Sequence, residues 1–124
     1  MEFNHVRTAD LTALRAADSA SRTSQSLLDQ KSGAQHIFVK MIRTPTDTGS
    51  LAGMHAHDYE QLFYIVAGVM SVELGEKTYE LPAGTLFVIP PGVPHKAWNA
   101  TPEEVLHLSI NSPLPTAQKA GAAG

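Results

Sequence analysis

Residues 55–57 read HAH and residues 84–95 read GTLFVIPPGVPH, and these two stretches decide the expected fold. On an extended strand, residues i and i+2 project to the same face, so His55 and His57 can direct two imidazoles to one point. The prolines and the glycine of the second stretch predict a turn that brings His95 onto a new strand. The spacing therefore predicts one site that is assembled from two separate segments.

The donor types in this predicted site favour a first-row divalent metal. Gln61 shares strand parity with the two histidines and can add an amide oxygen to three imidazoles. These donors suit Mn, Fe, Co, Ni or Zn, whereas Mg and Ca prefer shells of oxygen. We expect one such ion per chain, bound by His55, His57, Gln61 and His95. The neighbouring Glu60 is an alternative to Gln61 if the turn before it shifts the register by one residue.

Both stretches resemble the motifs of small single-domain cupins of the RmlC-like barrel type. The first cupin motif contains a glycine, two histidines, an acidic residue and a glycine, which correspond in order to Gly49, His55, His57, Gln61 and Gly68. Only the acidic position differs. The second motif is matched at every fixed position, by Gly84, Pro90, Gly92, His95 and Asn99. The resemblance implies an all-β double-stranded β-helix, or jelly-roll barrel, with a metal at the histidines.

The chain is expected to form one barrel with a short irregular or helical N-terminal extension. Helical spacing predicts a short helix near the start, from the positions of Leu11, Leu14 and Ala17, after a cap at Thr8 or Asp10. Apolar runs of strand length follow, separated by turn residues. We expect the extension over residues 1–34, the cupin barrel over 35–112 and a flexible tail over 113–124.

Three local features of the expected barrel can be predicted in more detail. Gly75-Glu76 separates two short strands, and glycine at the first central position suits a two-residue type II′ hairpin. Residues 29–34 should join the first two strands in the same way. A strand over residues 53–57 should carry the first two histidines.

Composition excludes several classes of protein. The chain has 124 residues, enough for one domain, and contains no cysteine, so disulfides and thiolate ligands are excluded. Its net charge of −3 argues against nucleic acid or an anionic membrane as a partner. Residues 1–7 lack the apolar segment of a secretion signal, and no apolar run approaches the length of a membrane span. We expect a cytoplasmic protein.

The sequence does not single out a catalytic acid or base. Glu60, Tyr64 and His107 are the candidates. If Leu106, Leu108 and Ile110 line the barrel, strand alternation directs His107 outward. Asn99 is expected to tie down a turn. The residues expected to fill the barrel are Phe38, Met41, Phe63, Tyr64, Phe87 and Ile89.

The neutral Gln61 decides the expected chemistry. Three imidazoles and an amide leave the charge of a divalent ion to be balanced by substrate or hydroxide, which favours Lewis-acid chemistry over oxygen activation. We therefore expect an enzyme that acts on a small anionic, oxygenated substrate by isomerisation, lyase or ring-opening chemistry. Cupins with this Gln that the chain resembles include uronate ring-opening and bacilysin-pathway isomerase types. The alternatives are a cupin dioxygenase that uses Fe, Mn or Ni with O2, and a non-catalytic cupin that binds a small molecule.

Residues 23–28 read as a strand without an obvious partner inside the barrel. Small cupins, which this chain resembles, are usually dimers, often through exchange of such a segment. We therefore expect a homodimer.

Overall fold

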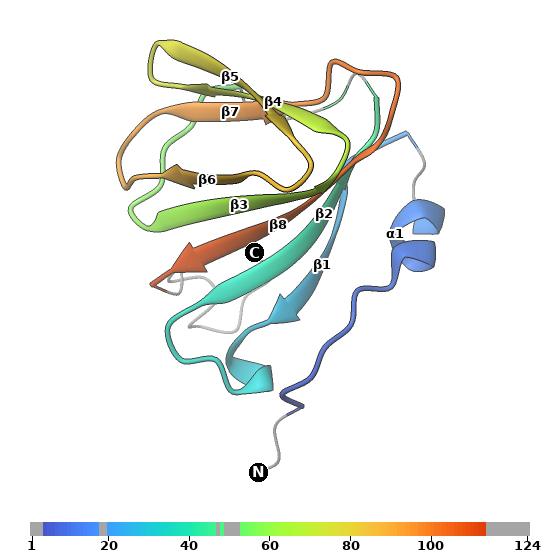
Figure 1. Ribbon diagram of the computed structural model, residues 1–124. Coiled ribbons are helices and arrows are strands. Elements are labelled where there is room, and N and C mark those ends of the chain that lie inside the picture. The colour runs from blue at the N-terminus through green and yellow to red at the C-terminus, as the bar shows by residue number, and fades with distance from the viewer. Residues whose placement is uncertain (1–3, 18–19, 47, 49–52, 114–124) are drawn as a thin grey trace.

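The computed structural model describes residues 4–17, 20–46, 48 and 53–113. Two antiparallel sheets face each other, and a short helix lies beside one of them (Figure 1). The first sheet has the order β1-β2-β8-β3-β6 and consists of β1 (Thr23–Leu28), β2 (Phe38–Thr44), β8 (Val105–Ser112), β3 (Glu60–Ala67) and β6 (Leu86–Ile89). The second has the order β5-β4-β7 and consists of β5 (Lys77–Pro82), β4 (Val69–Leu74) and β7 (His95–Trp98). The predicted all-β architecture is confirmed.

An apolar core fills the space between the two sheets. Both sheets contribute buried side chains to it, namely Phe63, Ile65, Ile89 and Val105 from the first and Met70, Val72 and Leu81 from the second. Removing this apolar surface from water is the main favourable contribution to folding. The core therefore holds the two sheets in the arrangement that positions the inner-facing polar residues.

The predicted N-terminal helix is confirmed as α1 (Leu11–Ala17). Asp10 caps it, because its Oδ1 accepts a hydrogen bond of 3.0 Å from the backbone N–H of Ala13. Leu14 is buried against Met41 and Leu106 on the outer face of the first sheet. The helix thus covers part of that face. In the described part of the chain, no helix is long and apolar enough to cross a membrane.

The expectation that residues 23–28 lack a partner inside the barrel was wrong. The segment is β1, which pairs with β2 of the same chain from Thr23, opposite Arg43, to Leu28, opposite Val39. Residues 29–34 do lie in the connection between the two strands, as predicted, but they contain a 3-10 helix, η1 (Gln30–Ser32), and not a two-residue turn. β1 is nevertheless the edge strand of its sheet, so it keeps one unpaired edge.

The other local predictions have mixed outcomes. The two-residue turn between β4 and β5 is confirmed, with Leu74 opposite Lys77 and Gly75 at a φ of 60°. The strand expected over residues 53–57 is only an isolated bridge, at His55. Gly49 and residues 114–124 of the expected tail lie outside the described residues.

The prediction for His107 was wrong, because it assigned the wrong face of β8 to the barrel interior. His107 is 1% exposed, and its ring packs edge to face on Phe63 at a centroid distance of 4.7 Å. Leu106 lies on the opposite face, under α1. The helix makes the outer face apolar as well, so the alternation of leucines did not identify the interior.

Two of the six residues expected to fill the barrel lie elsewhere. Tyr64 is 37% exposed on the outer face of β3, and Met41 packs under α1. The expectation is confirmed for Phe63 and Ile89, which are core residues, for Phe87, which packs against them, and for Phe38, which is buried at an inner-facing position of β2. The cause of the error is the same as for His107, because both faces of this sheet carry large apolar side chains.

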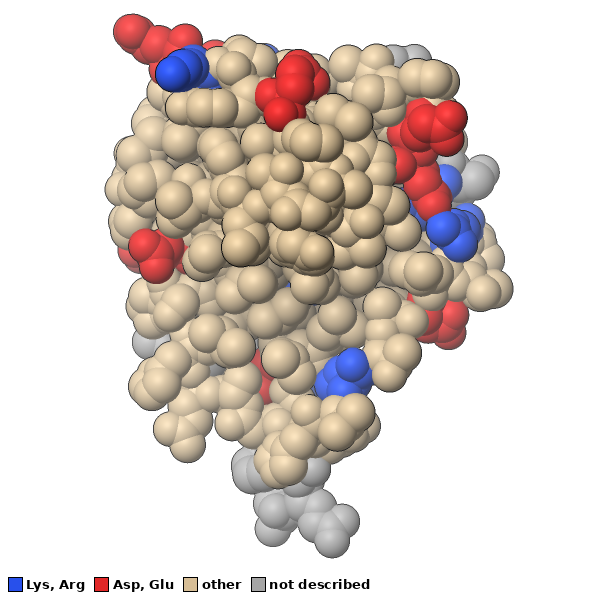
Figure 2. Space-filling model, viewed as in Figure 1, with Lys and Arg blue, Asp and Glu red and all other residues tan. Residues whose placement is uncertain are grey.

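Part of the outer face remains exposed and apolar. The exposed large apolar side chains include Tyr64 and Val66 on β3 and Leu86 and Val88 on β6. Figure 2 shows a broad surface without charge on the viewed side, with most charged side chains toward its margins. Such a surface is compatible with the expected homodimer, which stays a prediction.

Gly68 provides a test of the close packing between β3 and β8. Its φ is +82°, and a Cβ there would lie 2.5 Å from the backbone oxygen of Glu104. Gly84 has a similar φ of +88° but no atom within 4 Å of its Cβ position, so it is the matched control. We expect Gly84→Ala to cost about 1 kcal/mol, from the left-handed backbone alone. Gly68→Ala should cost about 2 kcal/mol more, because backbone must also move. Urea denaturation measures both losses, and equal losses would contradict this packing.

Candidate metal centre

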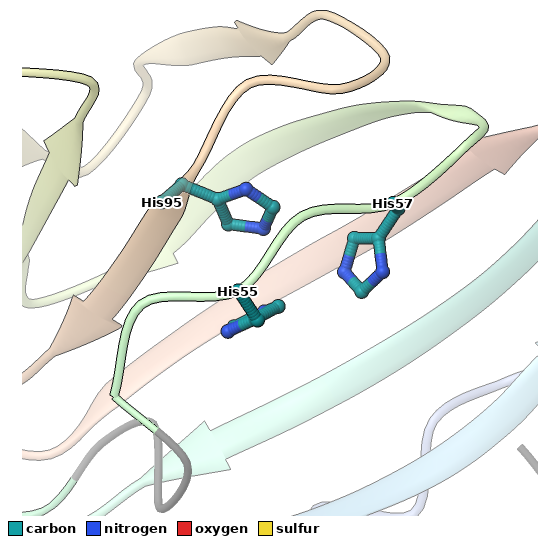
Figure 3. Close-up of side chains that lie close together, drawn as sticks. All are labelled: His55, His57 and His95. Atoms are coloured by element: carbon teal, nitrogen blue, oxygen red, sulfur yellow. The ribbon is translucent and has the colours of Figure 1, made fainter.

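Three histidines from separate segments meet at one end of the barrel. A backbone bridge places His55 opposite His95, the first residue of β7, with N–H to oxygen bonds of 2.9 and 2.8 Å. His57 is held by a third bond, because its carbonyl oxygen accepts from the N–H of Gly92 at 2.7 Å. Figure 3 shows the three imidazoles around a common space. One ligand nitrogen from each lies within 4.8 Å of the others, so the two predicted segments do form a histidine triad.

The second ring nitrogen of two histidines is fixed by backbone carbonyls. His95 Nδ1 lies 3.0 Å from the oxygen of Val93, and His55 Nδ1 lies 3.1 Å from the oxygen of Gly53. An Nδ1–H that donates to a carbonyl leaves Nε2 with a free lone pair, the usual arrangement of a metal-binding imidazole. The Nε2 of His95 is buried and has no hydrogen-bond partner among the described residues. This donor set fits a divalent transition metal.

The electrostatics of the triad favour neutral imidazoles. Burial lowers the pKa of His57 to about 4, and the neighbouring His55 and His95 lower it as well. Burial also lowers the pKa of His95, although its bond to Val93 acts in the opposite direction. Both rings are therefore neutral at pH 7. Neutral imidazole is the form that coordinates a metal.

Gln61 and Glu60 lie on opposite faces of β3. Gln61 is 9% exposed on the inner face, and its Nε2 donates to the Oγ of Ser109 at 3.1 Å. The bond holds the amide nitrogen and leaves the amide oxygen as the available ligand atom. Glu60 is exposed and does not share this face. Gln61 stays our predicted fourth ligand.

The three candidates for proton transfer occupy different positions. Glu60 and Tyr64 project from the outer side of β3, away from the inner face that carries Gln61. His107 projects inward, and neither of its ring nitrogens has a hydrogen-bond partner among the described residues. Of the three, His107 alone lies inside the barrel.

Asn99 has the structural role that the sequence predicted. It is fully buried, and its Nδ2 donates to the backbone oxygens of Thr44 and Glu103 at 3.1 and 2.6 Å. Its Oδ1 accepts from the N–H and the hydroxyl of Thr101. These bonds tie the segment after β7 to the end of β2.

Sequence reasoning missed two cations on the β1–β2 side of the barrel. Lys40 occupies an inner-facing position of β2, and Arg22 directly precedes β1. The available signal was a single lysine between Phe38 and Ile42, which share its face of the strand and are both buried. A charged residue at such a position of an apolar strand is uncommon.

The motifs and the triad geometry agree with one class of protein. Residues 46–111 match the cupin domain, so the chain belongs to the cupin family. Over 57 residues it is 35% identical to the H2HPP isomerase of Bacillus subtilis, a match that covers 45% of this chain and only 24% of that protein.

Two solved structures show the same fold. KdgF from Halomonas sp. has a TM-score of 0.67 and 21% identity, over 77% of this chain and 82% of its own. An RmlC-like cupin with a double-stranded β-helix fold, from Methanocaldococcus jannaschii, has a TM-score of 0.66 and 16% identity, over 85% of this chain and 90% of its own. The predicted double-stranded β-helix is thus confirmed.

Metal content is the first prediction from this geometry. Untagged protein reconstituted with Mn, Fe, Co, Ni or Zn should hold about one ion per chain by elemental analysis. His95→Ala should lower the affinity more than about tenfold, because it removes a buried donor whose orientation is already fixed. His36→Ala is the control, since His36 is exposed outside the triad. Absence of metal from the reconstituted wild type would contradict the assignment.

The buried His107 predicts a pH dependence of stability. Burial lowers its pKa from 6.5 to about 3, and the charges of Arg22 and Lys40 contribute. Between these values the unfolded chain binds a proton that the folded chain does not, so stability is complete above about pH 6.5 and falls as the pH decreases. From pH 7 to 5, His107 should account for about 2 kcal/mol of lost unfolding free energy. Urea denaturation of metal-free His107→Leu should show a correspondingly smaller loss, and an unchanged pH dependence would refute this role.

Proposed function

We propose that the protein is an enzyme in which a divalent transition metal acts as a Lewis acid on a small anionic, oxygenated substrate, by isomerase, lyase or ring-opening chemistry. The observation that carries this proposal is the triad of His55, His57 and His95, with its ligand nitrogens within 4.8 Å of one another. A metal site with a purely structural role does not need polar side chains around it that could contact a ligand. These histidines share the barrel interior with polar and cationic side chains. The arrangement therefore favours a site that also receives a ligand.

The proposed metal ligands are all neutral side chains. The three imidazoles and the amide oxygen of Gln61 would hold the ion, and Ser109 positions Gln61 through its hydroxyl. A divalent ion with only neutral ligands supplies strong polarisation of a carbonyl or enol oxygen. Because none of the four ligands carries charge, the protein leaves the compensation of that charge to the substrate. This favours an anionic, chelating molecule such as a 2-oxo acid or an enol.

The inner wall of the barrel supplies a candidate for proton transfer. His107 is neutral at pH 7, since burial lowers its pKa to about 3, and its two ring nitrogens have no partner among the described residues. It can therefore accept or donate a hydrogen bond to a bound molecule without introducing charge. Its position beside Phe63 keeps it in surroundings from which bulk water is excluded.

The similarity to a named isomerase also supports the proposed Lewis-acid chemistry. The H2HPP isomerase of Bacillus subtilis shares 35% identity over the matched 57 residues. The comparison favours isomerisation over dioxygenation, and the neutral Gln61 does as well, since oxygen activation requires higher oxidation states that anionic ligands stabilise. Turnover without oxygen uptake in an oxygen electrode is expected, and uptake in step with turnover would favour a dioxygenase.

The role of Gln61 can be tested with a nearly isosteric substitution. Gln61→Glu should bind zinc at least as tightly as the wild type, because a carboxylate adds charge attraction at the same place. Exchange of the C3 protons of 2-oxobutyrate in deuterium oxide, followed by NMR, reports polarisation of the carbonyl. The variant should slow this exchange about tenfold or more, equivalent to about 1.4 kcal/mol of barrier.

Gln35→Glu is the matched control, because it adds the same charge at an exposed position. It should leave both the zinc affinity and the exchange rate unchanged. If Gln61→Glu also leaves both unchanged, Gln61 is not a ligand. Absence of zinc-dependent exchange in the wild type would contradict the proposed chemistry itself.

A further inference from the structure

Two cations, Arg22 and Lys40, lie together at the β1–β2 edge of the first sheet. Lys40 is half-buried on β2, and Arg22 directly precedes β1. Burial lowers the pKa of Lys40, and the positive charge of Arg22 lowers it further, so the two groups are close enough to repel each other. Within the described residues, neither forms an ion pair with a carboxylate. Two adjacent cations repel each other, and an anion bound between them would relieve that repulsion.

The two cations border a cavity. Its volume is about 210 Å³, and it is lined by Arg22, Thr23, Ser24, Lys40 and Ile42. Since a water molecule occupies about 30 Å³, this space can hold a carboxylate or phosphate group together with several carbon atoms. The cavity therefore offers both the charge and the room for an acidic group.

The strand register relates this cavity to the predicted metal ligands. Lys40 lies opposite Ser109, and the hydroxyl of Ser109 accepts the hydrogen bond from Gln61. Phe38, two residues before Lys40, belongs to the same cross-strand row as Asn111 and Gln61. Gln61 and Lys40 are separated by two strand spacings, about 10 Å, and by two residues along the strand, about 7 Å, so their Cα positions lie about 12 Å apart. The side chain of Lys40 and the predicted metal both extend into this interval, which leaves a gap that a molecule of about four to six atoms in length can span.

Buried polar atoms lie on the inner face of β8, on either side of Ser109. The Oδ1 of Asn111 and both ring nitrogens of His107 are buried without hydrogen-bond partners among the described residues. His107 lies opposite Ile42, which borders the cavity. Buried polar groups are normally satisfied, so these atoms indicate a surface that contacts a polar ligand.

The charges on this inner surface specify the ligand further. Lys40 acts electrostatically on His57 as well as on His107, so its field reaches the triad. The acidic side chain whose charge acts on His57 is Asp58, which is exposed. A divalent ion with neutral ligands, together with two cations, leaves a large positive charge on one surface. A ligand with a single negative group would balance only part of it.

We propose that Arg22 and Lys40 form an anion subsite for a second acidic group of the substrate, whose first acidic group and neighbouring oxygen bind at the histidine triad. The substrate class is thus a small diacid with an oxo or enol group next to one acid. The inference rests on the proposed function, because it assumes that the triad binds one end of the substrate. The second acidic group is an oxyanion, either a carboxylate or a phosphate.

Calorimetric titration of the zinc-loaded protein tests this with two acids of equal length. 2-Oxoglutarate and 2-oxopentanoate differ in that only the former has a second carboxylate. We expect 2-oxoglutarate to bind at least about tenfold more tightly, equivalent to about 1.4 kcal/mol. Lys40→Met and Arg22→Met should each remove most of this preference while they change the affinity for 2-oxopentanoate much less.

Lys77→Met is the control for loss of one positive charge, because Lys77 is exposed on β5 in the other sheet. It should keep the full preference. Arg22 lies at the exposed rim, so its variant remains informative even if Lys40→Met fails to fold. 2-Oxo-4-phosphonobutyrate identifies the oxyanion: the diacid that loses more affinity in Arg22→Met and Lys40→Met carries the group that the subsite fits.

The outcomes separate this inference from the proposed function. Equal affinities for the two acids, or a preference that survives in both variants, would overturn the subsite, even if zinc-dependent exchange of 2-oxobutyrate is intact. Loss of the preference in both variants would support the subsite. If that loss occurs in a protein that shows no zinc-dependent exchange, the subsite stands and the proposed chemistry fails.

Discussion

The backbone bridge between His55 and His95 is the interaction on which the site depends. Two hydrogen bonds, of 2.9 and 2.8 Å, join a segment outside the regular strands to the start of β7. They bring together two histidines that are 40 positions apart in the sequence, and the bond from Gly92 to His57 secures the third. Carbonyl oxygens then orient the rings of His55 and His95. The site is thus prepared by main-chain pairing.

The sequence predicted those parts of the molecule that local chemistry determines. The turn at Gly75, the cap at Asp10 and the buried Asn99 each follow from the preferences of a single residue, and the structure confirms them. The meeting of His55, His57 and His95 was also predictable from the two cupin motifs, although residues 55 and 57 lie outside the regular strand that the parity argument assumed. These features can be predicted without knowing how distant parts of the chain pack against one another.

The errors arose where distant packing decides the outcome. The alternation of Leu106 and Leu108 identified an apolar face of β8 but not which face points inward, because α1 covers the outer one. His107 and Tyr64 were therefore placed on the wrong sides. Lys40 and Arg22 were missed for a related reason: they come together through the pairing of β1 with β2, and no motif marks them.

The histidine triad shares the barrel with two cations that form no ion pair with a carboxylate in the described part of the chain. We therefore propose that the three histidines hold a divalent ion whose charge the substrate balances. X-ray absorption at the zinc edge, on untagged reconstituted protein, counts the imidazole ligands. We expect three imidazole nitrogens about 2.0–2.1 Å from zinc, together with oxygen donors. A spectrum with fewer than three imidazoles, or one that His95→Ala leaves unchanged, would contradict this proposal.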